Sequence, residues 1–374
     1  MSIGLYVILC SGVFVLGLAL LGAYFTFVER NSFLEISDTV KIGAMKNAGV
    51  IQAVLFVLTS LALFFLSGDK KWFEENNFLT LCALIAGFGV IGLNASEKKI
   101  SLAAAALLQL AGIAAAVLLF PSGTVFFHMG LPPVVDNAAA VVLWFVYFRL
   151  LFVMDRLEGF TQENSICVGT VCFLGLFISA ELPPDFLRFG GLLLPVMMPL
   201  FPFYFLGCHL PMRGVARNIF CFFVGWVSFY LASKGAWGVG VLLAAYPLFE
   251  GIVFTCRFLK GLLTKNKPAF LFDTLLNRGI EPFTVVKFIF RRNVIICALA
   301  LLSFSASLQY QPVILAALFL LDFYIRVVSP SQGTPSLRSL FREMRENTRK
   351  EISETGKAFN AIKEKYSEKK DDKE

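Results

Sequence analysis

The sequence predicts an all-α fold, a polytopic transmembrane bundle of about eleven spans with the N-terminus outside and the C-terminus cytoplasmic. Hydrophobic residues make up 57% of the 374 residues and charged residues only 16%, against roughly 45–50% and 25% in soluble domains. Long apolar runs recur along the chain, and basic residues concentrate in alternate connections. This composition excludes a nucleic-acid-binding protein, a disordered chain and a soluble enzyme.

The predicted spans follow from the length of each apolar run. A helix needs about 20 apolar residues to cross the roughly 30 Å hydrocarbon core with its backbone hydrogen bonds satisfied internally. The first run is expected to stay as a span, because the amino terminus lacks the basic segment and cleavage site of a secretory signal. The predicted spans are 3–28, 48–67, 78–93, 101–120, 137–154, 165–182, 190–207, 218–233, 238–256, 290–308 and 312–328.

The orientation follows from the distribution of Lys and Arg between the two faces. With these spans, 29 of the 33 basic residues lie on the face that carries the carboxyl tail, and the other face has only Lys70, Lys71, Arg188 and Lys234. Positive residues are retained in the cytoplasm. The carboxyl tail is therefore predicted to be cytoplasmic, and much of the net charge of +7 is an orientation signal.

Two segments depart from the membrane pattern and define the predicted domains. Residues 1–328 are expected to form the membrane domain and residues 329–374 a basic, helical cytoplasmic tail. The connection 257–292 is the longest predicted cytoplasmic loop. Apolar residues with helical spacing predict a short helix there, before Arg278-Gly279. They are Phe270, Leu271, Leu275 and Leu276.

Four short strings stand at cytoplasmic span ends or in the long loop. They are FGVIGLNA at 88–95, MDRLEGF at 154–160, PLFE at 247–250 and LLNRGI at 275–280. In this order and at these positions, they resemble strings of the polyprenyl-phosphate N-acetylhexosamine-1-phosphate transferases. The resemblance covers roughly residues 40–328.

The resemblance implies a multi-pass protein of the bacterial inner (cytoplasmic) membrane, acting in the synthesis of cell-envelope polysaccharides. Members of this family, such as phospho-N-acetylmuramoyl-pentapeptide transferase, build their active site from cytoplasmic loops. They use magnesium to transfer a sugar phosphate from a UDP-sugar to a polyprenyl phosphate. The resemblance therefore implies a polyprenyl-phosphate lipid, and also a UDP-sugar, as ligands.

The chain departs from the family pattern at most catalytic positions. Asn94 and Ala95 stand where the family has paired aspartates, and residues 271–274 replace its histidine motif. Asp155 and Gly159 match the aspartate-rich motif, and Glu158 is a longer carboxylate in place of its second aspartate. The other replacements are Arg149, Phe152, Arg156, Arg217 and Asn218.

These replacements weaken the expected metal site. Magnesium prefers hard oxygen ligands, usually one or two carboxylates with phosphates and water. Here the catalytic candidates are Asp155 and Glu158, and the metal candidates are Asp155 and Glu250. We therefore expect catalysis to be absent or weak, with no cofactor, and magnesium only if the protein is active.

The replacements also introduce permanent cations. Arg149, Arg156 and Arg217 stand at positions that are neutral in the family, and Arginine binds phosphate bidentately. With Arg213 and Arg278, they are predicted to hold a polyprenyl phosphate or nucleotide-sugar without turnover. The competing interpretation is that all five are positive-inside anchors. Arg149 lies in an apolar stretch of the sequence, where a charged side chain normally has a partner. An ion pair of Arg149 with Asp155 or Glu158 is therefore a further alternative.

The expected role is that of a catalytically impaired homologue that binds the lipid carrier, or that pairs with a second copy or an active transferase. One alternative is an active transferase with a rearranged site on Asp155, Glu158 and Glu250. Another is an unrelated membrane transporter.

In the last predicted span, Asp322 is expected to pair with Arg326 one turn later.

Overall fold

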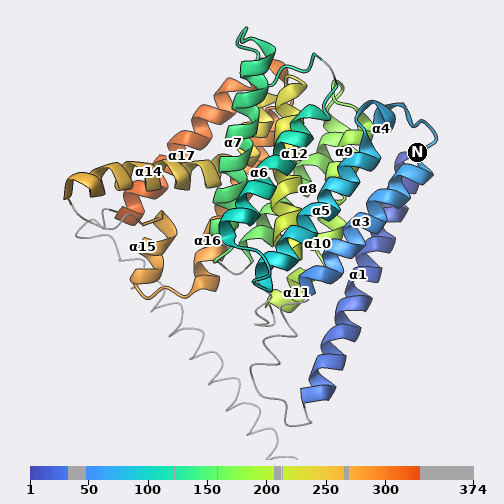
Figure 1. Cartoon of the computed structure of the whole chain (residues 1–374), viewed down its shortest axis with the longest axis horizontal. Helices are drawn as coiled ribbons and strands as arrows, with labels where there is room; N and C mark the ends of the chain where they lie inside the picture. The colour runs from blue at the N-terminus through green and yellow to red at the C-terminus, as the bar shows by residue number, and fades with distance from the viewer. Residues whose placement is uncertain are drawn as a thin grey trace, which may run out of the picture. The chain divides into compact units, whose positions relative to one another are not determined.

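The computed structural model describes residues 1–32, 48–121, 123–157, 159–205, 212, 214–264 and 269–328. The chain divides into two units, Met1–Leu321 and Asp322–Glu374, and the description below concerns the first unless stated. Within the described ranges every regular element is a helix (Figure 1). The long helices are α1 (Ile3–Ser32), α3 (Ala48–Leu66), α5 (Phe78–Ser96), α6 (Leu102–Leu118), α7 (Pro133–Met154), α8 (Phe160–Ile178), α12 (Val215–Ser233), α14 (Ala245–Thr264), α16 (Pro282–Leu302) and α17 (Tyr310–Val328). The shorter ones are α4 (Lys71–Glu75), α9 (Pro184–Gly191), α10 (Leu193–Met197), α11 (Leu200–Phe205), α13 (Trp237–Leu243), α15 (Leu271–Asn277) and the 3₁₀ turn η1 (Ala306–Leu308).

The all-α, membrane-type architecture is confirmed. Among the described residues, eight helices are long and apolar enough to cross a membrane, and a bent pair of helices would make a ninth. The α6 helix is apolar but shorter. The α16 helix, which carries Lys287, Arg291 and Arg292, is not among the eight. The count of eleven and the orientation of the termini stay predictions.

Several helix boundaries differ from the prediction. The α16 helix begins at Pro282 rather than at 290, because the basic residues that were assigned to the loop lie within the helix. The α8 helix begins at Phe160 rather than at 165. The stretch predicted as one span over 190–207 consists of the end of α9, α10 and α11, while Pro184–Pro202, which covers α9, α10 and the start of α11, counts as one of the eight candidate spans. Three prolines in this stretch lack the backbone donor that a continuous helix needs.

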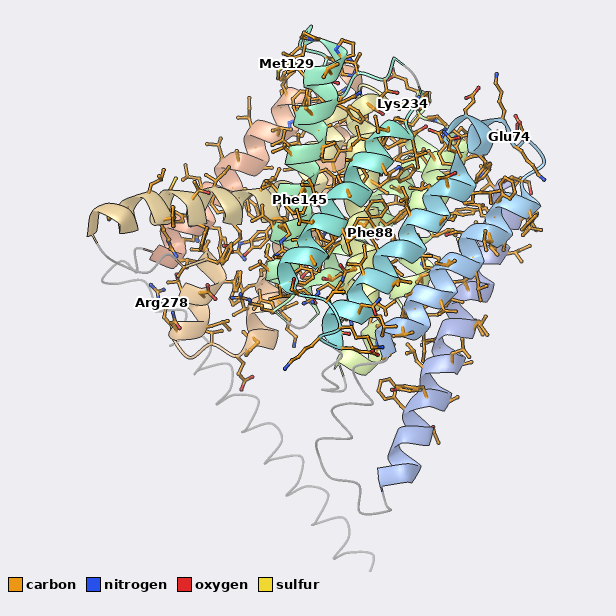
Figure 2. All side chains as sticks on the ribbon, viewed as in Figure 1. Glu74, Phe88, Met129, Phe145, Lys234 and Arg278 are labelled. Atoms are coloured by element: carbon orange, nitrogen blue, oxygen red, sulfur yellow. The ribbon has the colours of Figure 1, made fainter. Side chains whose placement is uncertain are left out.

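The bundle is organised around α12, the most deeply buried of the candidate spans. It packs against α3, α5, α7, α8 and α13. Aromatic side chains fill these contacts: Phe88 of α5 (labelled in Figure 2) stacks on Phe222, with ring centroids 4.1 Å apart. Trp144 of α7 fits against Gly225, where an added Cβ would lie 2.2 Å from the indole nitrogen. This glycine is therefore required for the close packing of α7 on α12.

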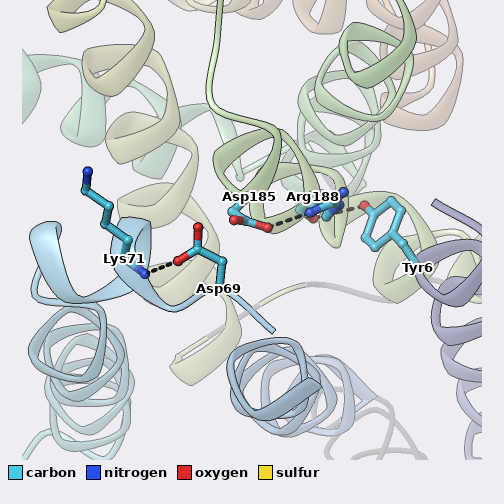
Figure 3. A network of polar contacts seen from close by, with 5 residues as sticks. All are labelled: Tyr6, Asp69, Lys71, Asp185 and Arg188. Carbon is cyan, nitrogen blue, oxygen red and sulfur yellow. Dashed lines mark hydrogen bonds and ion pairs between the residues drawn. The ribbon is translucent and has the colours of Figure 1, made fainter. Parts of the chain in front are cut away.

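The first helix is tied to α9 by a polar contact (Figure 3). The Tyr6 hydroxyl donates a 2.9 Å hydrogen bond to the carbonyl of Arg188, whose guanidinium pairs with Asp185 at 2.6 Å. An added Cβ at Gly191 would lie 2.5 Å from the Tyr6 oxygen. A small residue at position 191 thus permits α1 to approach the bundle.

The α13 and α14 helices form a broken pair, bent by 65°. In Figure 1, α14 runs across the direction of α7. Gln309 holds the start of α13, because its side chain accepts from the Gly238 N–H and donates to the Gly235 carbonyl.

The region predicted as a loop over 257–292 is largely helical in its described residues, because it contains the end of α14, all of α15 and the start of α16. Its predicted short helix is α15, which ends before Gly279 at φ +78°.

Candidate functional site

The end of α7 and the start of α12 bring together four of the residues singled out in the sequence. We call Arg149, Phe152, Asp155 and Arg217 the arginine cluster. The guanidinium carbon of Arg217 lies 3.6 Å from the Phe152 ring centroid, and that of Arg149 lies 5.0 Å from it. Cations over an aromatic face are attracted by its quadrupole. The Phe152 ring of α7 therefore attracts two guanidiniums, one from α7 and one from α12.

Asp155 supplies the negative charge of the cluster. Its side chain is 2% exposed, and its Oδ2 lies 3.9 Å from a terminal nitrogen of Arg217, whose side chain is 23% exposed. Its Oδ1 accepts a 2.5 Å hydrogen bond from the Thr161 hydroxyl. The four described residues of the arginine cluster thus comprise two guanidiniums and one carboxylate.

Of the two alternative ion-pair partners of Arg149, Asp155 forms no ion pair with it in the described part of the chain, and Glu158 lies outside the described residues. Arg149 instead donates a 3.4 Å hydrogen bond to the side-chain oxygen of Gln109 on α6. The Gln109 amide in turn donates to Asn218 at 2.6 Å, and Asn218 donates to the Gly214 carbonyl at 2.9 Å. The partner of Arg149 therefore comes from another helix.

Backbone geometry sets where these side chains lie. Asp155 is the C-cap of α7, and Gly159, at φ +96°, turns the chain into α8. Gly214 precedes α12 at φ +64°, a conformation that favours glycine. On α5, Gly92 approaches it so closely that an added Cβ would lie 2.4 Å from the Gly214 carbonyl oxygen. The end of α5 is thus pressed against the start of α12, beside Asn218.

The remaining predicted phosphate-binding residues lie elsewhere or are not described. Arg156 is exposed in the turn after α7. Arg278 is the C-cap of α15 (labelled in Figure 2). Arg213 and Glu158 lie outside the described residues. The geometry therefore assigns the strongest grouping to Arg149 and Arg217.

Glu250 joins a different network. It is fully buried on α14, and its two oxygens accept from the Tyr246 hydroxyl at 2.8 Å and from the Leu271 N–H at 2.7 Å. Arg257, two helical turns later, donates to the carbonyls of Ala269 and Phe270. Glu250 and Arg257 thus fasten α15 to α14.

These acids do not make a magnesium site as they stand. Both oxygens of Glu250 are occupied by protein donors, and Asp155 faces Thr161 and Arg217. Among the residues that the structure describes, no three His, Cys, Asp or Glu side chains are placed to ligate one metal ion. We therefore derive no catalytic step through magnesium.

Sequence reasoning missed Gln109 and the polar start of α8. Gln109 is a single amide in an alanine-rich helix, and it lies buried between Arg149 and Asn218. Thr161–Ser165 is a run of five polar residues that is buried rather than exposed. An intramembrane polar residue is costly without a partner, so the isolated Gln109 was the one available signal.

Comparison with known proteins adds no family to this geometry: no protein-family model matches the chain, and no curated protein matches its sequence.

Proposed function

We propose that this chain is a membrane-embedded, catalytically impaired homologue of the sugar-phosphate transferases that binds the phosphate of a polyprenyl phosphate at the arginine cluster. The observation that supports this most directly is the pair of guanidiniums, Arg149 and Arg217, on one Phe152 ring. Both are permanent cations with donor geometry suited to phosphate. Among the described members of the cluster, two guanidiniums accompany one carboxylate, that of Asp155.

The proposed topology has eleven spans, an outside amino terminus and a cytoplasmic carboxyl tail, in a bacterial inner membrane. This orientation puts the end of α7 and the start of α12 at the cytoplasmic face. A lipid headgroup in the inner leaflet could then reach the cluster while its chain stays in hydrocarbon. A nucleotide-sugar would compete for the same cations, since it also presents phosphate.

Thermal stability with added lipid tests this proposal. Polyprenyl phosphate at a hundred times its dissociation constant should stabilise the purified protein by about 2.7 kcal/mol. The gain should disappear in Arg149→Ala and Arg217→Ala. It should persist in Lys99→Ala, an exposed basic residue of the α5–α6 connection. A gain that survives both arginine substitutions would contradict the proposal.

The same preparation separates binding from turnover. Radiolabelled UDP-N-acetylhexosamine, polyprenyl phosphate and magnesium should give no labelled lipid. Label that appears and is lost in Asp155→Asn would instead establish an active transferase with a rearranged site. Copurification with a tagged second copy or with an active transferase tests the expectation from the sequence that the protein pairs with one of them.

A transporter is a second candidate, favoured by the 65° break between α13 and α14. Secondary transporters place their substrate sites at broken helices. This candidate gains if lipid phosphate leaves the melting temperature of the wild-type protein unchanged.

A further inference from the structure

The start of α8 places a further carboxylate, Glu163, inside the bundle. The five residues Thr161, Gln162, Glu163, Asn164 and Ser165 are each no more than 5% exposed. Thr161 donates a hydrogen bond to Asp155 of the arginine cluster. Glu163, one of the most buried acids of the described chain, has no role in it.

The surroundings of Glu163 offer one hydrogen bond and no counter-ion. Its Oε1 accepts a 2.8 Å hydrogen bond from the side-chain amide of Asn293 on α16. Its Oε2 is buried without a hydrogen-bond partner in the described part of the chain. No Lys, Arg or His among the described residues forms an ion pair with it.

Glu163 lies within a helix–helix contact rather than in a loop. Asn293 faces Glu163, and one turn further along, Cys297 lies 3.8 Å from the Cys167 carbonyl. In each pair the two residues are 130 positions apart in the sequence. Because this offset is the same for both pairs, α8 and α16 run parallel to each other. We call these two pairs the α8–α16 seam.

Few charged or titratable groups face Glu163. The thiols of Cys167 and Cys297 adjoin it along the seam, and the Tyr246 hydroxyl interacts with it electrostatically from α14. Behind Tyr246 lie three further groups. Glu250 accepts the hydrogen bond of the Tyr246 hydroxyl. The charge of Arg292 interacts with Tyr246, and the charge of Arg257 interacts with Glu250.

A buried carboxylate without a counter-ion must lose its charge or bind a cation, because an isolated ion is very costly in a low-dielectric interior. A metal cation would need several oxygen ligands. Asn293 turns its N–H₂ group toward Glu163, and no cluster of three acidic, thiol or imidazole ligands exists in the described ranges. A proton needs only one carboxylate oxygen, and Oε2 is available for it.

We propose that Glu163 is a proton-binding site in the α8–α16 seam, which holds a proton on Oε2 near neutral pH and releases it when the seam opens to water. The acceptor Oε1 keeps its bond to Asn293 in both states. A proton on Glu163 also removes a negative charge that would oppose Glu250 across Tyr246. Protonation of Glu163 therefore influences Glu250 and the hydrogen bond by which Glu250 holds α15.

Infrared spectroscopy of the full-length protein in lipid vesicles tests this proposal. A carbonyl band of a protonated carboxylic acid should be present at neutral pH and move to lower frequency in D₂O. The Glu163 component of this band should be lost in Glu163→Gln, which keeps a carbonyl acceptor for Asn293, and retained in the matched Glu250→Gln. A wild-type spectrum without such a band, or identical bands in wild type and Glu163→Gln, would overturn the proposal.

Two further measurements keep the test decisive. Sodium or potassium chloride at constant pH should leave the band unchanged, and its loss on adding salt would identify a metal-cation site instead. Should Glu163→Gln fail to fold, dicyclohexylcarbodiimide, which reacts with protonated buried carboxyls, should label the wild type at Glu163. A wild-type protein labelled only at other acids would overturn the proposal.

Discussion

The guanidinium of Arg217 lies 3.6 Å from the centre of the Phe152 ring. Arg149 reaches the same ring from its own helix, α7, at 5.0 Å. Like charges repel, so two guanidiniums gathered around one ring need a group that attracts both. The ring provides that attraction, and Asp155 reinforces it for Arg217.

Phe152→Leu should therefore loosen both guanidiniums. We expect a loss of about 1–2 kcal/mol of stability from the cation–π contacts, and a smaller stabilisation by polyprenyl phosphate. Thermal unfolding with and without the lipid measures both effects. Phe177→Leu, an exposed position of α8, is the matched control. Equal lipid responses in the two variants would show that the ring does not organise the cluster.

Gln109→Leu should break the link between Arg149 and Asn218. The buried Asn218 would lose its donor, and we expect a cost of about 1–3 kcal/mol. The double variant with Asn218→Leu should lose less unfolding free energy than the two single variants lose together, because both single substitutions remove the same hydrogen bond. Strict additivity of the two unfolding free energies would contradict the link.

Local sequence pattern predicted the parts of the fold that depend on local chemistry. Apolar runs predicted the all-α architecture, helical spacing predicted α15, and one-turn spacing predicted the 2.7 Å pair of Asp322 and Arg326 within the second unit. Each of these depends on residues a few positions apart. The sequence alone therefore carries enough information for them.

Tertiary partners explain what the pattern missed. The polar start of α8 resembles a loop, yet Glu163 finds Asn293 from 130 residues away. Spacing along the chain offered Asp155 or Glu158 as the partner of Arg149, whereas the structure gives Arg149 a hydrogen bond to Gln109 of α6. Such contacts are set by packing between helices, which hydropathy along one segment does not report.

Gly225→Ala should disrupt the contact of α12 with α7. An added Cβ would lie 2.2 Å from the Trp144 indole nitrogen, and overpacking of this kind costs about 1–3 kcal/mol. Gly12→Ala on α1, where nothing lies within 4 Å of the new methyl, is the control and should not destabilise. Melting temperatures of the two variants in the same detergent test the difference. A neutral Gly225→Ala would mean that α7 can move away from α12 without cost.

Glu250→Leu should release α15 without unfolding the bundle. The substitution leaves the Leu271 N–H and the Tyr246 hydroxyl without their acceptor, while the core around α12 keeps its contacts. Because segments with few remaining bonds open locally, amide hydrogen exchange should rise over residues 271–277 and stay unchanged over α12. Thr255→Leu, at an exposed position of the same helix, should change neither. Faster exchange throughout α12 would instead show that Glu250 supports the whole bundle, and that α15 is not an independently held element.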